Sequence, residues 1–93
     1  MNIEFELDRF TDTRFSLDVF EIKKGSRQLL TTFTVHKPGF TFTSVHNFSS
    51  KTLDYLIKNN YIELIEKWEL TSLTAETTIC NCRLTQKTLL EIL

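Results

Sequence analysis

The chain has 93 residues, 41% of them hydrophobic and 25% charged, which is typical of one globular domain and excludes disordered and collagen-like classes. No run reaches the roughly 18 consecutive apolar residues of a membrane-spanning helix, and the acidic start MNIEFELDRF lacks the basic and apolar regions of a secretion signal. The sequence therefore predicts a cytoplasmic protein, with no membrane partner, whose residues 1–93 form a single domain.

Charge is unevenly distributed along a chain whose net charge is −1. Residues 1–22 carry six acidic and two basic side chains, whereas residues 23–48 carry four basic ones and no acidic one. Residues 49–93 carry five basic and six acidic side chains. Because phosphates are bound through clustered Lys and Arg, the stretch 23–48 is a local basic patch in a chain poorly suited to strong nonspecific binding of nucleic acid.

The N-terminal part, residues 1–41, is predicted to be rich in strands. Residues 2–8 alternate apolar and acidic side chains, the period-two pattern of a half-buried strand. Residues 14–23 alternate at first and then change phase, which indicates either a bulged strand, which we favour, or a helix that ends at Gly25.

Two turn signals divide the segments that follow. After the turn at residues 24–26, residues 27–35 alternate and are rich in β-branched side chains, although Ser26 is also suited to capping a helix. After the second turn, at residues 37–39, residues 40–45 are rich in Phe and Thr, which are typical of strands.

The C-terminal half begins with a predicted helix that runs to about Asn60. Ser49 or Ser50 is suited to be its N-cap, because a serine hydroxyl accepts a hydrogen bond from a free amide of the first turn. Successive rotations of 100° give the helix an apolar side and a polar side. The apolar side holds Leu53, Leu56 and Ile57, with Asn60 at its end, and the polar side holds Lys51, Asp54, Tyr55 and Lys58.

The rest of the chain predicts a long β-hairpin followed by a short helix. Residues 61–70 and 77–84 are the expected strands, with a loop at 72–76, and Thr85 is suited to cap a helix over residues 86–93. Two helical turns are too short to be stable alone, so this helix must pack on its own domain or on a second copy.

Residues 42–93, with LDYLIKNNYIEL in the helix and CRLTQKTLLEIL at the end, resemble the C-terminal part of winged helix-turn-helix domains. The matching residues are Leu53, Leu56, Asn60, Tyr61, Ile62, Leu84 and Thr85. The resemblance implies an α+β fold, in which a winged-helix-like part (helix, β-hairpin wing and short helix) follows a strand-rich N-terminal segment. The sequence departs from the family where two further helices are expected, and its wing tip carries Glu76 instead of Lys or Arg.

The resemblance also implies a function, that of a small transcriptional regulator that binds double-stranded DNA as a homodimer. Its helix would enter the major groove, and the dimer interface would be the apolar C-terminal helix or the N-terminal strand. The implied DNA-contacting residues are Ser50, Lys51, Tyr55, Lys58 and Asn59.

Two other interpretations of the same features remain open. The polar helix face carries an Asp54 and Lys58 pair at i, i+4, and such faces commonly meet only water. The alternative function is a protein–protein interaction module, an adaptor or small inhibitor, that uses the acidic strand at residues 2–8 as a pairing edge or as a nucleic-acid mimic.

No residue pattern in the sequence predicts catalysis, a cofactor or a metal site. Cys80 and Cys82 share one face of a predicted strand, but even with His36 and His46 they lack the spacing of a zinc site. We expect two reduced thiols in the core, because the chain has no secretion signal. A glycine-rich phosphate loop is excluded, since the chain has only two glycines.

Overall fold

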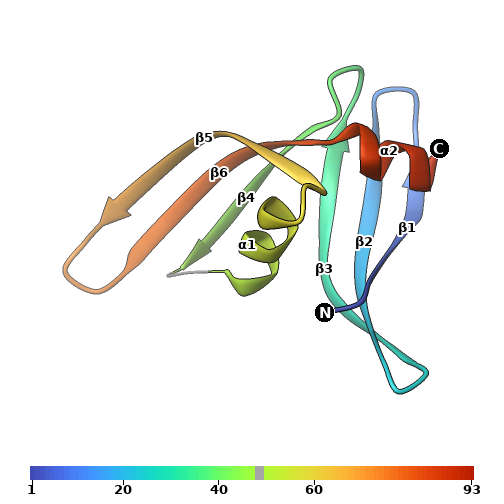
Figure 1. The fold of residues 1–93 in the computed structure, drawn as a ribbon. Helices are drawn as coiled ribbons and strands as arrows, with labels where there is room; N and C mark the ends of the chain where they lie inside the picture. The colour runs from blue at the N-terminus through green and yellow to red at the C-terminus, as the bar shows by residue number, and fades with distance from the viewer. Residues whose placement is uncertain (48–49) are drawn as a thin grey trace.

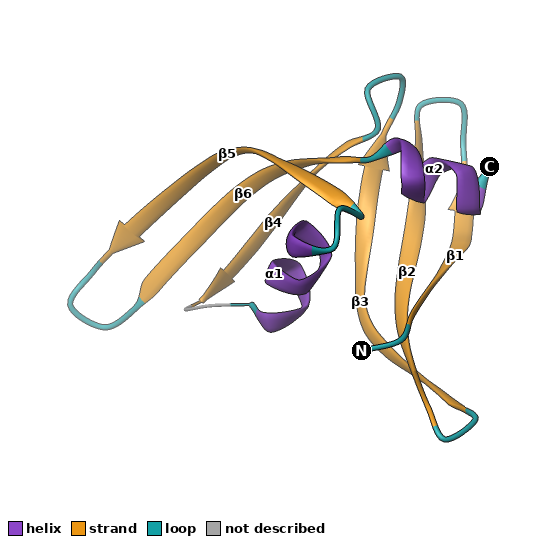
Figure 2. Ribbon diagram, in the orientation of Figure 1, coloured by secondary structure: helices purple, strands orange, loops and turns teal. Residues whose placement is uncertain are grey.

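Alternating apolar and polar side chains build an antiparallel sheet in the computed structural model, which describes residues 1–47 and 50–93 (Figures 1 and 2). Within these residues the strands follow one another in space as β1-β2-β3-β4-β6-β5. The strands are β1 (Ile3–Phe10), β2 (Arg14–Lys23), β3 (Ser26–His36), β4 (Thr41–Asn47), β5 (Ile62–Thr71) and β6 (Glu76–Leu84). The helices of the described chain are α1 (Lys51–Lys58) and α2 (Gln86–Ile92).

The predicted α+β, winged-helix-like fold is wrong. The segment that would need two helices forms β2 and β3 instead, joined by a tight turn in which Lys24 and Gly25 both have positive φ, 50° and 79°. Such a turn matches the right-handed twist of a hairpin. The supposed wing is also part of the sheet, because β6 pairs with β4 as well as with β5. The winged-helix identity, and the DNA-binding homodimer based on it, therefore lose their structural basis.

A narrow joint divides the sheet into two halves, β1-β2-β3 and β4-β6-β5. β3 and β4 are paired only at His36 and Thr41, beside the turn that connects them. Beyond this point the two halves diverge, and α1 lies between them (Figure 1). The rings of Phe33 and Phe42 stack across the joint with centroids 4.2 Å apart, so side-chain packing continues where the hydrogen-bonded ladder ends.

The core lies between the diverging halves, where both meet α1. From α1, Leu53 and Leu56 are buried, and Leu56 is 0% exposed. The other buried apolar residues come from both halves of the sheet: Phe15, Leu17, Val19, Phe33 and Val35 from the first, and Phe42, Ile62, Cys80, Cys82 and Leu84 from the second. The strands predicted at residues 14–23 and 77–84 are therefore confirmed, and each buries the side chains of one face.

The end of α1 is fixed by the backbone of the residues that follow it. Asn60 has a φ of 63°, and the amides of Asn60 and Tyr61 donate to the carbonyls of Ile57 and Leu56. This is the Schellman arrangement, in which a left-handed residue ends a helix and redirects the chain. The predicted helix end near Asn60 is thus confirmed, and the chain enters β5 directly.

The carbonyl of Tyr61 joins α1, β5 and α2. It accepts hydrogen bonds from the Thr85 amide (3.2 Å) and from the hydroxyl of the fully buried Thr88 (2.6 Å). The Thr85 hydroxyl lies 3.0 Å from it and 2.7 Å from the Asn60 carbonyl, so its single proton is shared between the two or goes to Asn60. Thr85 is the residue before α2, as predicted, but its hydroxyl makes no capping bond to that helix. The Tyr61 ring meets Phe5 of β1 edge to face at 5.3 Å.

Two local predictions can be compared with the backbone in detail. Residues 14–23 form the favoured strand, but the predicted bulge lies in its neighbour: the β2–β3 register shifts between Val19 and Phe20 because Leu30 of β3 is the extra residue. Ser50 is the N-cap of α1, and its hydroxyl accepts from the Leu53 amide at 3.2 Å. Ser49, the other candidate, lies outside the described residues.

Replacing Leu56 by Ala should lower the free energy of unfolding by about 3 kcal/mol, because it leaves a cavity between α1 and both halves of the sheet. Leu90→Ala is the matched control, because Leu90 is also helical but 72% exposed, and its cost should stay within about 0.5 kcal/mol. Urea denaturation followed by circular dichroism measures both. Equal losses would contradict the packing of α1.

Candidate interaction surface

The β5–β6 hairpin projects beyond the rest of the sheet as an arm. In β5 every residue after Ile62 is exposed. The strand therefore shows no alternation of buried and exposed residues, and its apolar and polar side chains do not alternate regularly either. A register shift between Leu64 and Glu66 places an extra residue, Ile65, at a bulge. Because a bulge reverses which face the following side chains take, apolar residues appear on both faces of the arm.

One face of the arm, turned away from α1, carries a row of apolar side chains. Val45 is paired with Ile79 and Ile79 with Trp68, so the three side chains lie side by side across β4, β6 and β5. Val45 is 63% exposed and Trp68 46%. Leu70 lies two residues beyond Trp68 on the same face, and Ile65 borders Thr43 and Asn81 of that face. We call Val45, Ile65, Trp68, Leu70 and Ile79 the outer patch.

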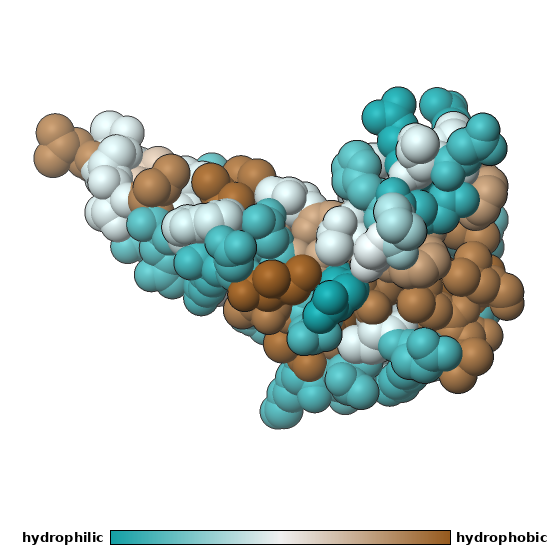
Figure 3. Space-filling view, turned by 90° about the horizontal axis from the view of Figure 1, so that it is seen from above, coloured by the Kyte–Doolittle hydropathy of each residue, from teal (hydrophilic) through white to brown (hydrophobic). Residues whose placement is uncertain are grey.

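Apolar residues continue to the end of the arm. Leu73 in the hairpin turn is fully exposed, and Figure 3 shows hydrophobic residues along the arm and at its tip. A single exposed apolar side chain is ordinary, but a contiguous group on a sheet face is typical of an interaction site.

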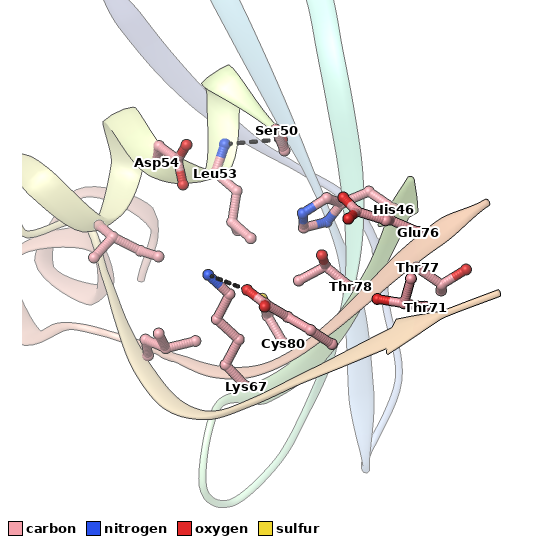
Figure 4. A pocket seen from close by; sticks show the side chains of 13 residues that line it. His46, Ser50, Leu53, Asp54, Lys67, Thr71, Glu76, Thr77, Thr78 and Cys80 are labelled. Carbon is pink, nitrogen blue, oxygen red and sulfur yellow. Dashed lines mark hydrogen bonds and ion pairs between the residues drawn. The ribbon is translucent and has the colours of Figure 1, made fainter. Parts of the chain in front are cut away.

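The opposite face of the arm forms a polar cleft with α1. The cleft has a volume of about 460 Å³ and is lined by residues of β4, α1, β5 and β6 (Figure 4). Lys67 and Glu69 form an ion pair of 3.2 Å on its β5 wall, and Asp54 of α1 faces them across it. The Nδ1 atom of His46 is buried and has no hydrogen-bond partner among the described residues.

The cleft holds no metal-binding cluster in the described part of the chain. Among residues 1–47 and 50–93, no three His, Cys, Asp or Glu side chains lie close enough to hold a metal ion. Cys80 lines the cleft from β6, and Cys82 lies behind it in the core. Burial raises the pKa of the Cys80 thiol, and burial together with the charge of Cys80 raises the pKa of Cys82 to about 11. Both free thiols are thus poor nucleophiles at neutral pH.

The residues predicted to contact DNA lie on α1, but most of their polar groups have structural roles. Ser50 caps the helix, the Tyr55 hydroxyl donates to the Met1 carbonyl at 2.6 Å, and the Asn59 amide donates to the Tyr55 carbonyl at 2.9 Å. Lys51 and Lys58 remain exposed at the helix surface. α1 lies between the sheet halves (Figure 1), and in the described residues strands rather than a preceding helix flank it.

The acidic strand predicted at residues 2–8 is β1, the other edge of the sheet. Two of its carboxylates are already engaged, because Arg27 of β3 reaches across β2 and pairs with Glu4 at 3.4 Å and with Glu6. The same guanidinium lies 3.9 Å above the ring of Phe20. Arg27 therefore neutralises part of the acidic surface that a basic partner would have needed.

Sequence reasoning did not find the outer patch. The segment ELIEKWEL reads as one strand, and a regular strand would place Leu64 and Trp68 on the same face. The signal that could have indicated the bulge was the pair of adjacent apolar residues Leu64 and Ile65. This pair interrupts the alternation at the residue where the β5–β6 register shifts.

No family model, curated protein or solved structure matches this chain. In the described residues neither helix has the length and apolar character that crossing a bilayer requires. The cytoplasmic location remains a prediction.

At pH 8 the thiols of the folded protein should react with a disulfide reagent at least roughly a hundredfold more slowly than in urea. The reason is that unfolding returns Cys82 from a pKa of about 11 to the ordinary value near 8.5 and exposes it. Absorbance of the released thiolate follows the reaction, and Cys82→Ala identifies which thiol reacts. A thiol that reacts equally fast in the folded protein would show a reactive site in the cleft.

Proposed function

We propose that this protein is a non-catalytic protein-binding module whose binding surface is the outer patch. The observation that carries this proposal is the row of exposed Val45, partly exposed Ile79 and exposed Trp68, extended by Leu70 along the same face. Tryptophan is enriched among the residues that dominate binding energy, because it buries a large rigid surface at a small entropic cost. A half-exposed Trp among exposed aliphatic side chains is the expected centre of such an interface.

The charges around the patch indicate which partner fits it. On the same face of β5, Glu63 is paired with Arg83 at 3.1 Å, whereas Glu66 has no ion pair among the described residues. A partner with an apolar centre and a basic residue at its margin would cover Trp68 and neutralise Glu66. Opposite charges at an interface margin favour association and exclude acidic competitors.

This proposal keeps the interaction module inferred from the sequence and changes its surface. Edge strand β1 is still exposed, but Arg27 already pairs with two of its acids. The outer patch, in contrast, has no intramolecular cover among the described residues. The raised thiol pKa values of Cys80 and Cys82 support a binding role over nucleophilic catalysis.

Substituting Trp68 by Arg should abolish capture of the partner, because the substitution places a charge at the centre of the apolar row. Leu90→Arg is the matched control, since it adds the same charge at an exposed apolar residue of α2. Nuclease-treated extract of the source cells is passed over each immobilised protein, and bound proteins are quantified by mass spectrometry. A partner lost with Trp68→Arg and kept with Leu90→Arg is expected.

The purified partner then provides a direct test, because Trp68 is the chain's single tryptophan. Burial of its ring should shift the emission to shorter wavelength and protect it from iodide quenching. Stoichiometric binding that leaves the emission and the quenching unchanged would place the interface elsewhere and contradict the proposal.

A further inference from the structure

The outer edge of β5 offers a row of free backbone groups. At the end of the arm the Ser72 amide donates to the Ala75 carbonyl at 2.9 Å, which makes these residues a hydrogen-bonded pair. In an antiparallel ladder, bonded and non-bonded pairs alternate. Leu70 and Trp68 therefore direct their N–H and C=O groups to β6, whereas Thr71, Glu69 and Lys67 direct theirs away from it. Within the described chain, β5 has no neighbour on that side.

The protection of this edge against pairing is limited to charged side chains. Edge strands are commonly protected by charged residues, above all lysine, by proline, by a bulge or by a covering segment, and β5 carries the charged residues Glu66, Lys67 and Glu69. The bulge of β5 lies at Ile65, before the segment concerned, and the register from Glu66 to Thr71 is regular. The side chains of Lys67 and Glu69 are 49% and 69% exposed, so a further strand would meet no obstacle from them.

The charges on this edge select one register of pairing. When a strand pairs with its own copy around a two-fold axis, the axis passes through one residue of the strand. An axis at residue 67 opposes two lysines, and an axis at residue 69 opposes two glutamates. With the axis at Trp68, Lys67 of each chain faces Glu69 of the other, twice, and both residues present free backbone groups. Opposite charges in directly facing positions stabilise a pair of strands, and like charges destabilise it.

We propose that the protein self-associates by antiparallel pairing of β5 with β5 of a second copy, around a two-fold axis at Trp68. The strand that best complements Lys-Trp-Glu in antiparallel orientation is one that itself reads Lys-Trp-Glu, which is why a second copy is the occupant. This interface goes beyond the proposed function and does not depend on any other partner. It also differs from the helix or N-terminal strand that the sequence indicated.

The same pairing brings the two outer patches together. Trp68 faces its symmetry mate in a non-hydrogen-bonded pair, where Cα atoms are about 4.5 Å apart and side chains are closest. Aromatic side chains in this position stabilise strand pairs. The apolar row then runs from Val45 through Ile79 to Trp68 and on through the same residues of the second copy in reverse order. One continuous apolar surface replaces two separate ones.

The other edge of the sheet does not fit a second copy. On β1 the side chains of Glu4, Glu6 and Asp8 follow one another on one face, so self-pairing around an axis within this run places acid opposite acid. Its register is also interrupted between Leu7 and Arg9. Of the two edges, only β5 carries alternating charge in a regular segment.

Charge reversal tests the register. Sedimentation velocity from about 1 µM to 1 mM should show a concentration-dependent dimer for the natural chain. Lys67→Glu should raise its dissociation constant about tenfold, because the two-fold axis creates two facing pairs of like charge in each dimer. Combining Lys67→Glu with Glu69→Lys should restore the natural value, since opposite charges face each other again. Lys51→Glu, with the same net charge as Lys67→Glu, should leave the constant unchanged.

Several results would overturn the proposal. A natural chain that stays monomeric to about 1 mM excludes the dimer, and a double reversal that fails to restore it excludes the register. Circular dichroism checks that each variant is folded. Because both reversals lie on the cleft face, they leave the outer patch intact, and partner capture by the double variant tests the proposed function separately.

Cross-linking gives a second, geometric test. Under mild oxidation Trp68→Cys should give a covalent dimer, because the introduced thiols face each other at a Cα separation within the range of a disulfide. Leu70→Cys is the control, since the same register places its two copies about 13 Å apart. Covalent dimer in the Leu70→Cys protein at an equal rate, or none in the Trp68→Cys protein, contradicts an axis at Trp68.

Discussion

The carbonyl of Tyr61 is the point on which the arrangement of the molecule depends. Its donors, the Thr85 amide and the Thr88 hydroxyl, come from the start of α2, while the amide of the same residue ends α1 on the carbonyl of Leu56. One residue thus sets the direction of β5, the start of α2 and the end of α1. Since Thr88 is fully buried, water could not replace its hydroxyl as a hydrogen-bond donor to the Tyr61 carbonyl if that hydroxyl were removed. The direction of the arm, and with it the exposure of the outer patch, follows from this junction.

Exposure of the arm is a consequence of how the core is placed. The two helices cover the centre of the sheet and the region near β1, and neither reaches the far part of β5. The bulge at Ile65 then moves Trp68 and Leu70 to the face that no helix covers. An uncovered face and an unpaired edge therefore occur on the same six residues, Glu66 to Thr71, and Trp68 belongs to both proposed interactions, as the centre of the outer patch and as the residue on the two-fold axis.

Local structure was predictable from the sequence and its assembly was not. The N-cap at Ser50 and the helix end at Asn60 were predicted correctly, because each depends on a few neighbouring residues. The bulge expected in residues 14–23 lies instead at Leu30 of the paired strand β3. The winged-helix resemblance used Asn60, Tyr61, Leu84 and Thr85, which here serve a Schellman stop, a strand start and the Tyr61 junction. These local devices fit many folds. The order in which distant strands pair, with β6 between β4 and β5, cannot be predicted from any local sequence pattern.

The narrow joint between β3 and β4 separates two kinds of strand pairing. β1, β2 and β3 pair with strands that are next to them in the sequence. β4 pairs along its whole length with β6, which follows only after α1 and β5. Closing a larger loop costs more chain entropy and slows folding. The first three strands can thus form as a meander on their own, while the arm, the most exposed part of the molecule, is completed last, when the chain has been synthesised beyond residue 84.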